Sequence, residues 1–303
     1  MLVSQLILEI TNLNLPYSQG VDLCSYLLDV DYDSLKNSRN LEIEISDDLV
    51  SKKTKYKNIQ ELLNAISEGY PISYITFRRE FYGREFLVNE NTLIPRVCSE
   101  TLIETVLNFI NNSINNKSNN PFFNNYFKKN EQKENLRILD LCTGSGALGI
   151  TVSKELEMLG IKVDLTLLDI SSKAIDVAKE NCKLQNIYNY NLQVEDLVNF
   201  NSEEKFHIII CNPPYIDKSS YNDLENSVKY EPIDALIAED SGLFFYKFIL
   251  SKFSLLCKYM GMIFFEIGYN QGQDLKNISK AYNLKCEIKK DYSNIDRVAI
   301  IYE

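Results

Sequence analysis

The sequence has few of the residues on which metal sites, disulfide frameworks and membrane spans are built. It contains a single histidine, His207, and its seven cysteines include no Cys-x-x-Cys pair. Neither a zinc site nor a set of disulfides is therefore expected, and reduced thiols in a cytosol fit best. No apolar run approaches the ~20 residues that span a bilayer, and the first residues lack the basic start and cleavage site of a signal peptide. We expect a cytoplasmic protein.

Positive charge is also scarce. The chain has 32 basic and 42 acidic residues, so its net charge is −10 at pH 7. Because nucleic-acid affinity rests mainly on Lys and Arg, this balance argues against a broad phosphate-binding face and predicts no stable nucleic-acid binding. Residues 52–57 are locally basic. Either a solvated helix face or a docking patch for an acidic partner explains them.

What the sequence does contain changes character along its 303 residues. Residues 1–70 repeat apolar side chains at helical spacing, with Asp47 or Asp48 as an N-cap, and predict a small helical bundle. A period near two over 74–88, with a turn at Gly83, predicts a β-hairpin.

Strand-like and helical runs then alternate to the end of the chain. The segment 111–135 is crowded with Asn, Lys and Ser and predicts a surface loop, and a long helix is predicted over 244–259. The alternation implies an α/β fold with a mostly parallel sheet, whose ligands bind at the carboxyl ends of its strands. The expected parts are a helical N-terminal domain, a hairpin linker and an α/β domain at 1–70, 71–95 and 96–303.

An apolar strand at 208–210 runs almost directly into Asn212-Pro213-Pro214-Tyr215. Each proline fixes φ and holds its predecessor extended, so the segment leaves the sheet as a stiff rod. The side-chain oxygen of Asn212 and the carbonyl of Pro213 are then acceptors at fixed points, with the Tyr215 ring beside them. This suits a planar –NH₂ group, which has two N–H donors and a flat π system. A strand that simply ends in a proline turn is the alternative.

A second group of residues predicts a nucleoside cofactor. Small residues follow the strand that ends at Asp140-Leu141 and open a helix: Cys142, Thr143, Gly144, Ser145 and Gly146. Gly-x-Gly-x-x-Gly at 144–149 does not by itself distinguish a dinucleotide from another nucleoside ligand. Asp169 ends the next strand, where an acid binds ribose hydroxyls, and Asp196-Leu197 follows the third, where it would meet an adenine amine. Acids that merely cap helices are the alternative.

In this order on consecutive strand ends, these residues resemble the Rossmann-like S-adenosylmethionine-dependent methyltransferases. More narrowly, nearly the whole chain resembles the release factor glutamine methyltransferases. The segments that carry this narrower resemblance are Pro71–Ile75, Arg79–Tyr82, Thr92–Arg96, Glu231-Pro232, Ala235-Leu236, Glu266–Gly268 with Gln271, and Asp296–Val298. The resemblance implies a class I methyltransferase fold with a seven-stranded, mostly parallel sheet.

The resemblance also implies an activity, which is methylation of the glutamine side-chain amide in the Gly-Gly-Gln motif of bacterial class I peptide-chain release factors. S-adenosylmethionine would be bound by Asp140, Cys142, Thr143, Gly144, Ser145, Gly146, Asp169, Asp196, Leu197 and Asn212. Asn212 and Pro213 would accept the two amide N–H groups, and Tyr215, with Pro214 beside it, would hold the amide plane in line with the methyl group. No metal is needed.

Substrate selectivity would come from outside the cavity. The helical domain and the hairpin would grip the release factor, because a glutamine loop alone offers little area. Glu231 and Arg297 are either substrate contacts or members of structural ion pairs. His207 is expected to be structural. We expect a monomer.

Three departures from the family and two rival functions accompany this interpretation. Cys142 stands where the family commonly has glycine, Val97-Cys98-Ser99 replaces its usual Pro-Glu-Thr, and the Asn-rich segment at 111–135 is an insertion before the first strand. The first rival is a methyltransferase acting on an exocyclic amine of adenine or guanine, which predicts a base-extrusion pocket and a basic groove. The charge balance counts against it. The second is a non-enzymatic assembly protein that binds the cofactor. The intact Asn212–Tyr215 segment counts against this second rival.

Overall fold

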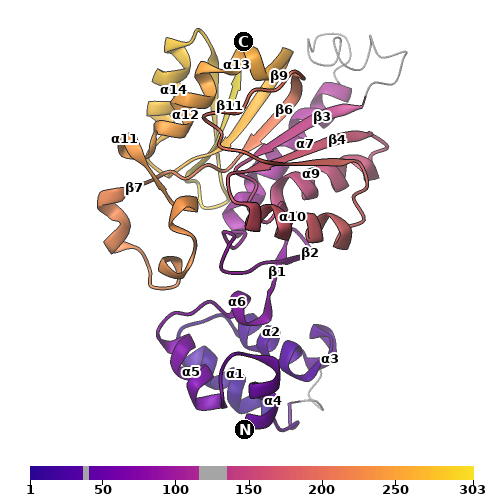
Figure 1. The fold of residues 1–303 in the computed structure, drawn as a ribbon, viewed down its shortest axis with the longest axis vertical. Helices are drawn as coiled ribbons and strands as arrows, with labels where there is room; N and C mark the ends of the chain where they lie inside the picture. Colours follow the sequence, from indigo (N-terminus) through magenta and orange to yellow (C-terminus); the bar gives the residue numbers. More distant parts are fainter. Residues whose placement is uncertain (37–40, 116–134) are drawn as a thin grey trace. The chain divides into compact units, whose positions relative to one another are not determined.

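The computed structural model describes residues 1–36, 41–115 and 135–303, which form two compact units (Figure 1). Unit 1 comprises Met1–Arg78 and the short segment Leu224–Tyr230. Unit 2 comprises Arg79–Asp223 and Glu231–Glu303.

Unit 1 is helical, as its apolar spacing predicts. Its helices are α1 (Val3–Asn12), α2 (Tyr17–Leu28), α3 (Tyr32–Lys36), α4 (Asp47–Lys53), α5 (Ile59–Ser67) and α6 (Ile72–Thr76). Leu6, Leu27 and Leu62 are fully buried in its core. The predicted N-cap of α4 is wrong by one residue, because the Ser46 hydroxyl accepts from the Leu49 N–H. Asp47 instead accepts from the N–H of Ile59 at 2.9 Å.

The hairpin is confirmed, but it begins later than predicted. Residues 74–76 belong to α6, which starts after Pro71 and ends at Phe77 in a left-handed conformation. Strands β1 (Arg78–Phe81) and β2 (Arg84–Leu87) follow and pair with each other. Tyr82 and Gly83 both have positive φ, which is the turn that matches the twist of a two-residue hairpin.

A seven-stranded sheet forms the centre of unit 2, in the order β10-β11-β9-β6-β3-β4-β5. Its strands are β3 (Leu136–Leu141), β4 (Val163–Asp169), β5 (Tyr190–Val194), β6 (Phe206–Cys211), β9 (Cys257–Glu266), β10 (Lys285–Lys290) and β11 (Asp296–Tyr302). β11 is antiparallel to both of its neighbours, and the other pairings are parallel. The predicted mostly parallel sheet is therefore confirmed.

Helices cover both faces of this sheet (Figure 1). Alternate residues along β3 point to opposite faces, so that Ile138 and Leu139 belong to different apolar clusters. The helices that pack on the Ile138 face are α7 (Glu100–Asn115), α9 (Ala147–Met158) and α10 (Ser172–Leu184). Those on the Leu139 face are α12 (Phe244–Ser251), α13 (Phe253–Leu256) and α14 (Gly272–Ala281).

The strand order creates a crevice between β3 and β6. The chain fills the sheet from β3 outward through β4 and β5, then returns to place β6 on the other side of β3. Leu141 is paired with Cys211 at the carboxyl ends of these two strands. The segments that follow β3 and β6 therefore leave the sheet side by side, at the kind of switch point where α/β sheets bind ligands.

Two predictions about local structure are wrong. The polar segment at 111–135 begins as helix, because α7 continues to Asn115 with Ile110 and Ile114 on its apolar face; residues 116–134 lie outside the described part of the chain. The long helix predicted over 244–259 ends at Leu256, since Cys257 begins β9 and pairs with Phe206. Pairing within the sheet overrides the helical pattern there.

The sequence predicts roles for residues at both ends of β6. His207 lies at its amino end, where Nδ1 accepts from the backbone N–H of Arg137 at 2.9 Å. Asn212 follows its carboxyl end. His207 is thus buried in a structural contact at the opposite end of the strand. None of the helices in the described residues combines the length and the apolar character that crossing a bilayer requires.

Candidate active site

A cavity of about 280 Å³ lies in unit 2 at the carboxyl ends of β3, β4, β5 and β6. The predicted site residues in its wall are Cys142, Thr143, Gly144, Ser145, Asp169, Asp196, Leu197, Asn212 and Pro214. Asp140, Gly146, Pro213 and Tyr215 are not part of this wall. The topology therefore gathers most of the predicted residues from four strand ends into one place.

The loop after β3 is built from left-handed backbone. Cys142, Gly144 and Gly146 have φ values of 55°, 54° and 81°. The left-handed conformation favours glycine at Gly146, and a Cβ there would lie 2.8 Å from Cδ1 of Ile150, which would have to shift. No atom lies near the position of a Cβ on Gly144, which leaves its backbone open on the cavity side. The loop then leads into α9.

Asp140 holds this loop in place through hydrogen bonds. Its side chain is buried, and Oδ2 accepts from the Thr143 hydroxyl at 2.6 Å and from the Gly149 N–H at 3.0 Å. Burial raises the pKa of Asp140 to about 7, although both hydrogen bonds lower it. Oδ1 has no hydrogen-bond partner among the described residues. The contacts of Asp140 are thus with the loop, and its direct contact with a cofactor stays a prediction.

Asp169 ends β4 and is held by two backbone groups. Oδ2 accepts from the Gly144 N–H at 2.8 Å, and Oδ1 accepts from the Ser171 N–H at 2.9 Å. Each carboxylate oxygen keeps a further lone pair, and the side chain lines the cavity. Burial raises the pKa of Asp169. Asp196, which follows β5, is oriented by accepting from the Val198 N–H at 2.9 Å.

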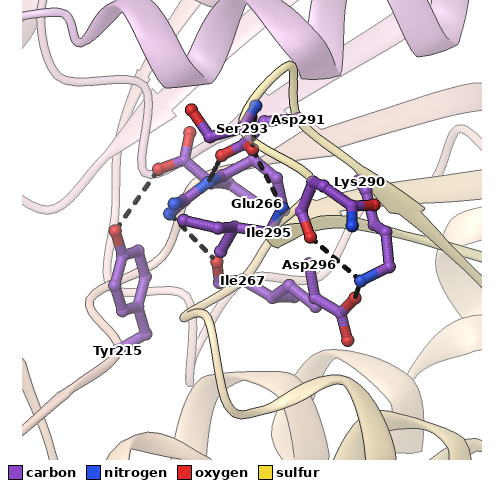
Figure 2. Close-up of polar contacts among 10 residues, drawn as sticks. Tyr215, Glu266, Ile267, Lys290, Asp291, Ser293, Ile295 and Asp296 are labelled. Carbon is purple, nitrogen blue, oxygen red and sulfur yellow. Dashed lines mark hydrogen bonds and ion pairs between the residues drawn. The ribbon is translucent and has the colours of Figure 1, made fainter.

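The Asn212–Tyr215 segment follows β6 with two free acceptors. Asn212 is half-buried in the cavity wall, and Pro213 and Pro214 are buried. Within the described residues, no group donates a hydrogen bond to the Asn212 side chain or to the Pro213 carbonyl. The Tyr215 hydroxyl instead donates to Oε1 of Glu266 at 3.4 Å (Figure 2). Neither of these two residues lines the cavity.

The remaining wall comes from segments distant in sequence. Thr92, Leu93 and Pro95 belong to the segment before α7, and Phe81 and Phe245 come from β1 and α12. The sequence marked Thr92–Arg96 only through the family resemblance. Phe81 was likewise marked only through the resemblance, as part of Arg79–Tyr82. The sequence contained no signal for Phe245, because its place in the wall depends on how α12 packs.

Glu231 holds the 92–96 segment in place. Its buried carboxylate accepts from the Ile94 N–H at 3.0 Å and forms an ion pair with Arg96. Arg297 donates through Nε to Asp291 at 3.3 Å and is largely enclosed. Of the two roles predicted for Glu231 and Arg297, these contacts favour the structural ion pair for each.

Fold and site together define a Rossmann-like class I methyltransferase that uses S-adenosylmethionine: a mostly parallel sheet, a glycine loop after its first strand, and a cavity over its strand ends. The model of the methyltransferase small domain family matches residues 121–228. The chain is 34% identical to the release factor glutamine methyltransferase of Fusobacterium nucleatum over 97% of this chain and 78% of that protein. It is 31% identical to that of Mycoplasma mycoides over 96% and 94%. The chain belongs to the family of release factor glutamine methyltransferases, which confirms the predicted resemblance.

The residues in the cavity fit S-adenosylmethionine. Asp169 offers lone pairs for ribose hydroxyls, the open backbone at Gly144 admits close approach of a ligand, and Leu197 adds an apolar surface beside Asp196. Among the described residues, no group of three or more His, Cys, Asp or Glu is arranged to hold a metal ion.

Proposed function

We propose that this protein methylates the side-chain amide nitrogen of the glutamine in the Gly-Gly-Gln motif of bacterial class I peptide-chain release factors. The observation that carries the proposal is the free amide of Asn212 in the wall of the cavity, one residue beyond the Leu141–Cys211 pairing. An acceptor for an –NH₂ group thereby adjoins the loop that would hold the methyl donor. The family's relatives carry the matching name.

The chemistry follows from the nature of an amide. Its nitrogen is a poor nucleophile, because the lone pair is delocalised into the carbonyl. Asn212 Oδ1 and the Pro213 carbonyl would each accept one N–H of the glutamine, which draws both N–H bonds toward the protein and leaves the lone pair toward the methyl group. S-adenosylmethionine, when bound, supplies an electrophilic methyl group on its sulfonium.

Orientation is the main contribution of the remaining residues. Pro213 and Pro214 hold the acceptors at fixed points, since neither φ angle can relax. Tyr215 would limit the rotation of the amide plane, so that its nitrogen stays in line with the methyl carbon. The glutamine nitrogen would bond to the methyl carbon as the bond from that carbon to sulfur breaks, which leaves a neutral thioether. The nitrogen would then lose a proton to water, because this proton is strongly acidic at that stage. No dedicated base is needed.

The setting of the reaction forms part of the proposal. Release factors act in translation, so we place the reaction in the cytoplasm. The helical residues 1–70 and the linker 71–95 would grip the factor while 96–303 carries the cofactor and the reacting amide. With a net charge of −10, the protein would act as a monomer without stable binding of nucleic acid.

A labelling experiment tests the proposal. The protein is incubated with methyl-labelled S-adenosylmethionine and a bacterial release factor, either intact or with the Gly-Gly-Gln glutamine replaced by Ala. We expect label on the intact factor only. Asn212→Ala should lower the rate by about 10²–10³-fold, because one preorganised acceptor is lost.

The matched control is Asn191→Ala, which removes an exposed amide on β5 outside the cavity wall and should leave the rate unchanged. Label on the factor that lacks the glutamine, or on RNA or DNA in place of the factor, would contradict the proposal.

A further inference from the structure

Tyr215 is held at two points, by the last residue of β9 and by the segment that follows this strand. Its hydroxyl donates to Oε1 of Glu266, and its carbonyl accepts from Nε2 of Gln271 at 3.2 Å. Figure 2 shows the hydroxyl of Tyr215 directed at the Glu266 carboxylate. Neither Glu266 nor Gln271 lines the cavity, so neither is placed to touch a ligand there.

Glu266 is an unusual residue to bury at this position. It is the last residue of β9, and only 1% of it is exposed. Its Oε2 has no hydrogen-bond partner in the described part of the chain, and burial raises the pKa of the carboxyl group. A buried carboxyl group is costly unless its contacts compensate. Its Oε1 accepts from the Tyr215 hydroxyl, and the nearby Ser99 and Arg297 also lower the pKa of Glu266. One of the contacts that offset this cost is therefore made with the Asn212–Tyr215 segment.

Gln271 makes use of its whole amide. Oε1 accepts from the Gly268 N–H at 2.8 Å and from the Tyr246 hydroxyl at 3.3 Å. Nε2 donates to the carbonyls of Tyr215 and Gly242 at 3.2 and 3.4 Å. Four hydrogen-bonding groups thus meet at one buried side chain, and the carbonyl of Tyr215 is one of its acceptors.

Gly242 completes the enclosure of that carbonyl. Its φ is 82°, and a Cβ at this position would overlap the carbonyl oxygen of Tyr215. Backbone from the α11 segment (Glu239–Gly242) therefore packs directly against the end of the Asn-Pro-Pro-Tyr segment. The carbonyl of Tyr215 is confined by contact on one side and by the Gln271 amide on another.

We propose that Glu266 and Gln271 are positioning residues for the methyl transfer, which hold Tyr215 at its hydroxyl and at its carbonyl and so fix the Asn212–Pro213 acceptors beside the cofactor loop. This inference rests on the proposed function. The prolines make the segment stiff, but a stiff rod still pivots about its far end. Anchoring Tyr215 removes that freedom. The rate should depend on this anchoring, because it depends on the orientation of the two acceptors.

The first experiment replaces Gln271 by Glu, which keeps shape and Oε1 but puts an oxygen against the two carbonyls. Methylation of a release factor is measured as kcat and KM, and cofactor affinity by calorimetry. We expect kcat to fall about tenfold or more, with both the KM for the factor and the Kd for S-adenosylmethionine within about threefold of wild type. Gln273→Glu makes the same change on the exposed side of α14 and should match wild type in all three.

The second experiment is a cycle on the Tyr215–Glu266 contact, using Tyr215→Phe, Glu266→Leu and the double variant. If Glu266 acts through Tyr215, Glu266→Leu lowers kcat about tenfold alone but has no further effect in the Tyr215→Phe background. Glu266→Gln keeps an acceptor for the hydroxyl and should retain most of the activity.

The outcomes separate this inference from the proposed function. Wild-type protein that does not label the glutamine overturns both. If wild-type protein does label the glutamine, two results would overturn the positioning role alone. One is a Gln271→Glu variant with normal kcat. The other is a double variant whose loss of kcat equals the product of the losses in Tyr215→Phe and Glu266→Leu. A melting temperature is measured for each variant, and a loss of kcat that appears only in variants that are partly unfolded at the assay temperature also counts against positioning.

Discussion

At the scale of single residues, Cys142 adopts a backbone conformation that its side chain makes costly. Its φ of 55° is in the left-handed region, which costs a non-glycine residue about 1–2 kcal/mol. Replacing Cys142 by glycine would remove this cost, but the greater conformational entropy of glycine in the unfolded chain offsets part of the stabilisation. We expect Cys142→Gly to raise the free energy of unfolding by about 0.5–1 kcal/mol in urea titrations.

Cys286→Gly is the matched control, because Cys286 lies in β10 without a positive φ. This substitution should lower the free energy of unfolding. Equal losses for the two variants would show that the conformation of Cys142 is not strained.

Asp140 makes stability depend on pH. Burial raises its pKa to about 7 from 3.8, so the folded protein binds a proton more tightly than the unfolded chain. The stabilising contribution of this proton is complete below pH 3.8 and is lost as the pH rises to about 7. Asp140→Asn removes the titration and can keep the oxygen that accepts from Thr143 and Gly149.

We therefore expect the free energy of unfolding of wild type, relative to Asp140→Asn, to decrease between pH 5 and about pH 7 and then level off. Urea titrations across this range measure the difference. A relative stability that rises with pH would mean that the carboxylate is stabilised in the fold.

At the scale of elements, Glu231 joins the 92–96 segment to the chain that follows Tyr230. Burial raises the pKa of Glu231, and the nearby Arg96 lowers it. Glu231→Gln keeps the size of the side chain but leaves one of two donors, the buried Ile94 N–H or the half-exposed Arg96 guanidinium, without an oxygen. The expected loss in free energy of unfolding is about 2 kcal/mol.

Hydrogen exchange should locate this effect. The Ile94 amide is expected to exchange faster in Glu231→Gln, since its acceptor is weakened. Glu203→Gln, an exposed change between β5 and β6, should alter neither quantity. Unchanged exchange at Ile94 with reduced stability would place the effect of Glu231 elsewhere than in this segment.

At the scale of the whole molecule, the cavity belongs to one of two compact units. All residues in its wall lie in Arg79–Asp223 or Glu231–Glu303. S-adenosylmethionine at about 100 times its Kd should stabilise the folded state of that unit by about 2.7 kcal/mol, because it binds the folded form. Slowly exchanging amides in the sheet should become better protected, while locally opening amides of Met1–Arg78 should not.

Hydrogen exchange with and without the cofactor measures the protection of amides in each unit. Asp169→Ala should abolish the added protection, because it removes a carboxylate from the cavity wall. Equal protection in both units would mean that they unfold as one.

Local patterns along the chain were enough to predict most of the elements and the family. Apolar runs with the period of strands or helices identified most of the sheet and its helices, and Asn212–Tyr215, the glycine loop and Asp169 predicted strand-end chemistry, because each signal involves neighbours along the chain. The confirmed fold class and family rest on these local patterns.

The contacts that hold these segments together could be seen only in the folded protein. Glu231 meets Ile94, Gln271 meets Tyr215, and Cys257 pairs with Phe206 across long stretches of chain. A hydrogen bond between distant residues leaves no periodicity in the sequence, since its partners are chosen by the register of the sheet and the packing of its helices. Phe81 and Phe245 are missing from the predicted site for the same reason, since packing alone brings them to the cavity wall. Asn212 and Asp169 could be predicted, because each directly follows or ends a strand along the chain.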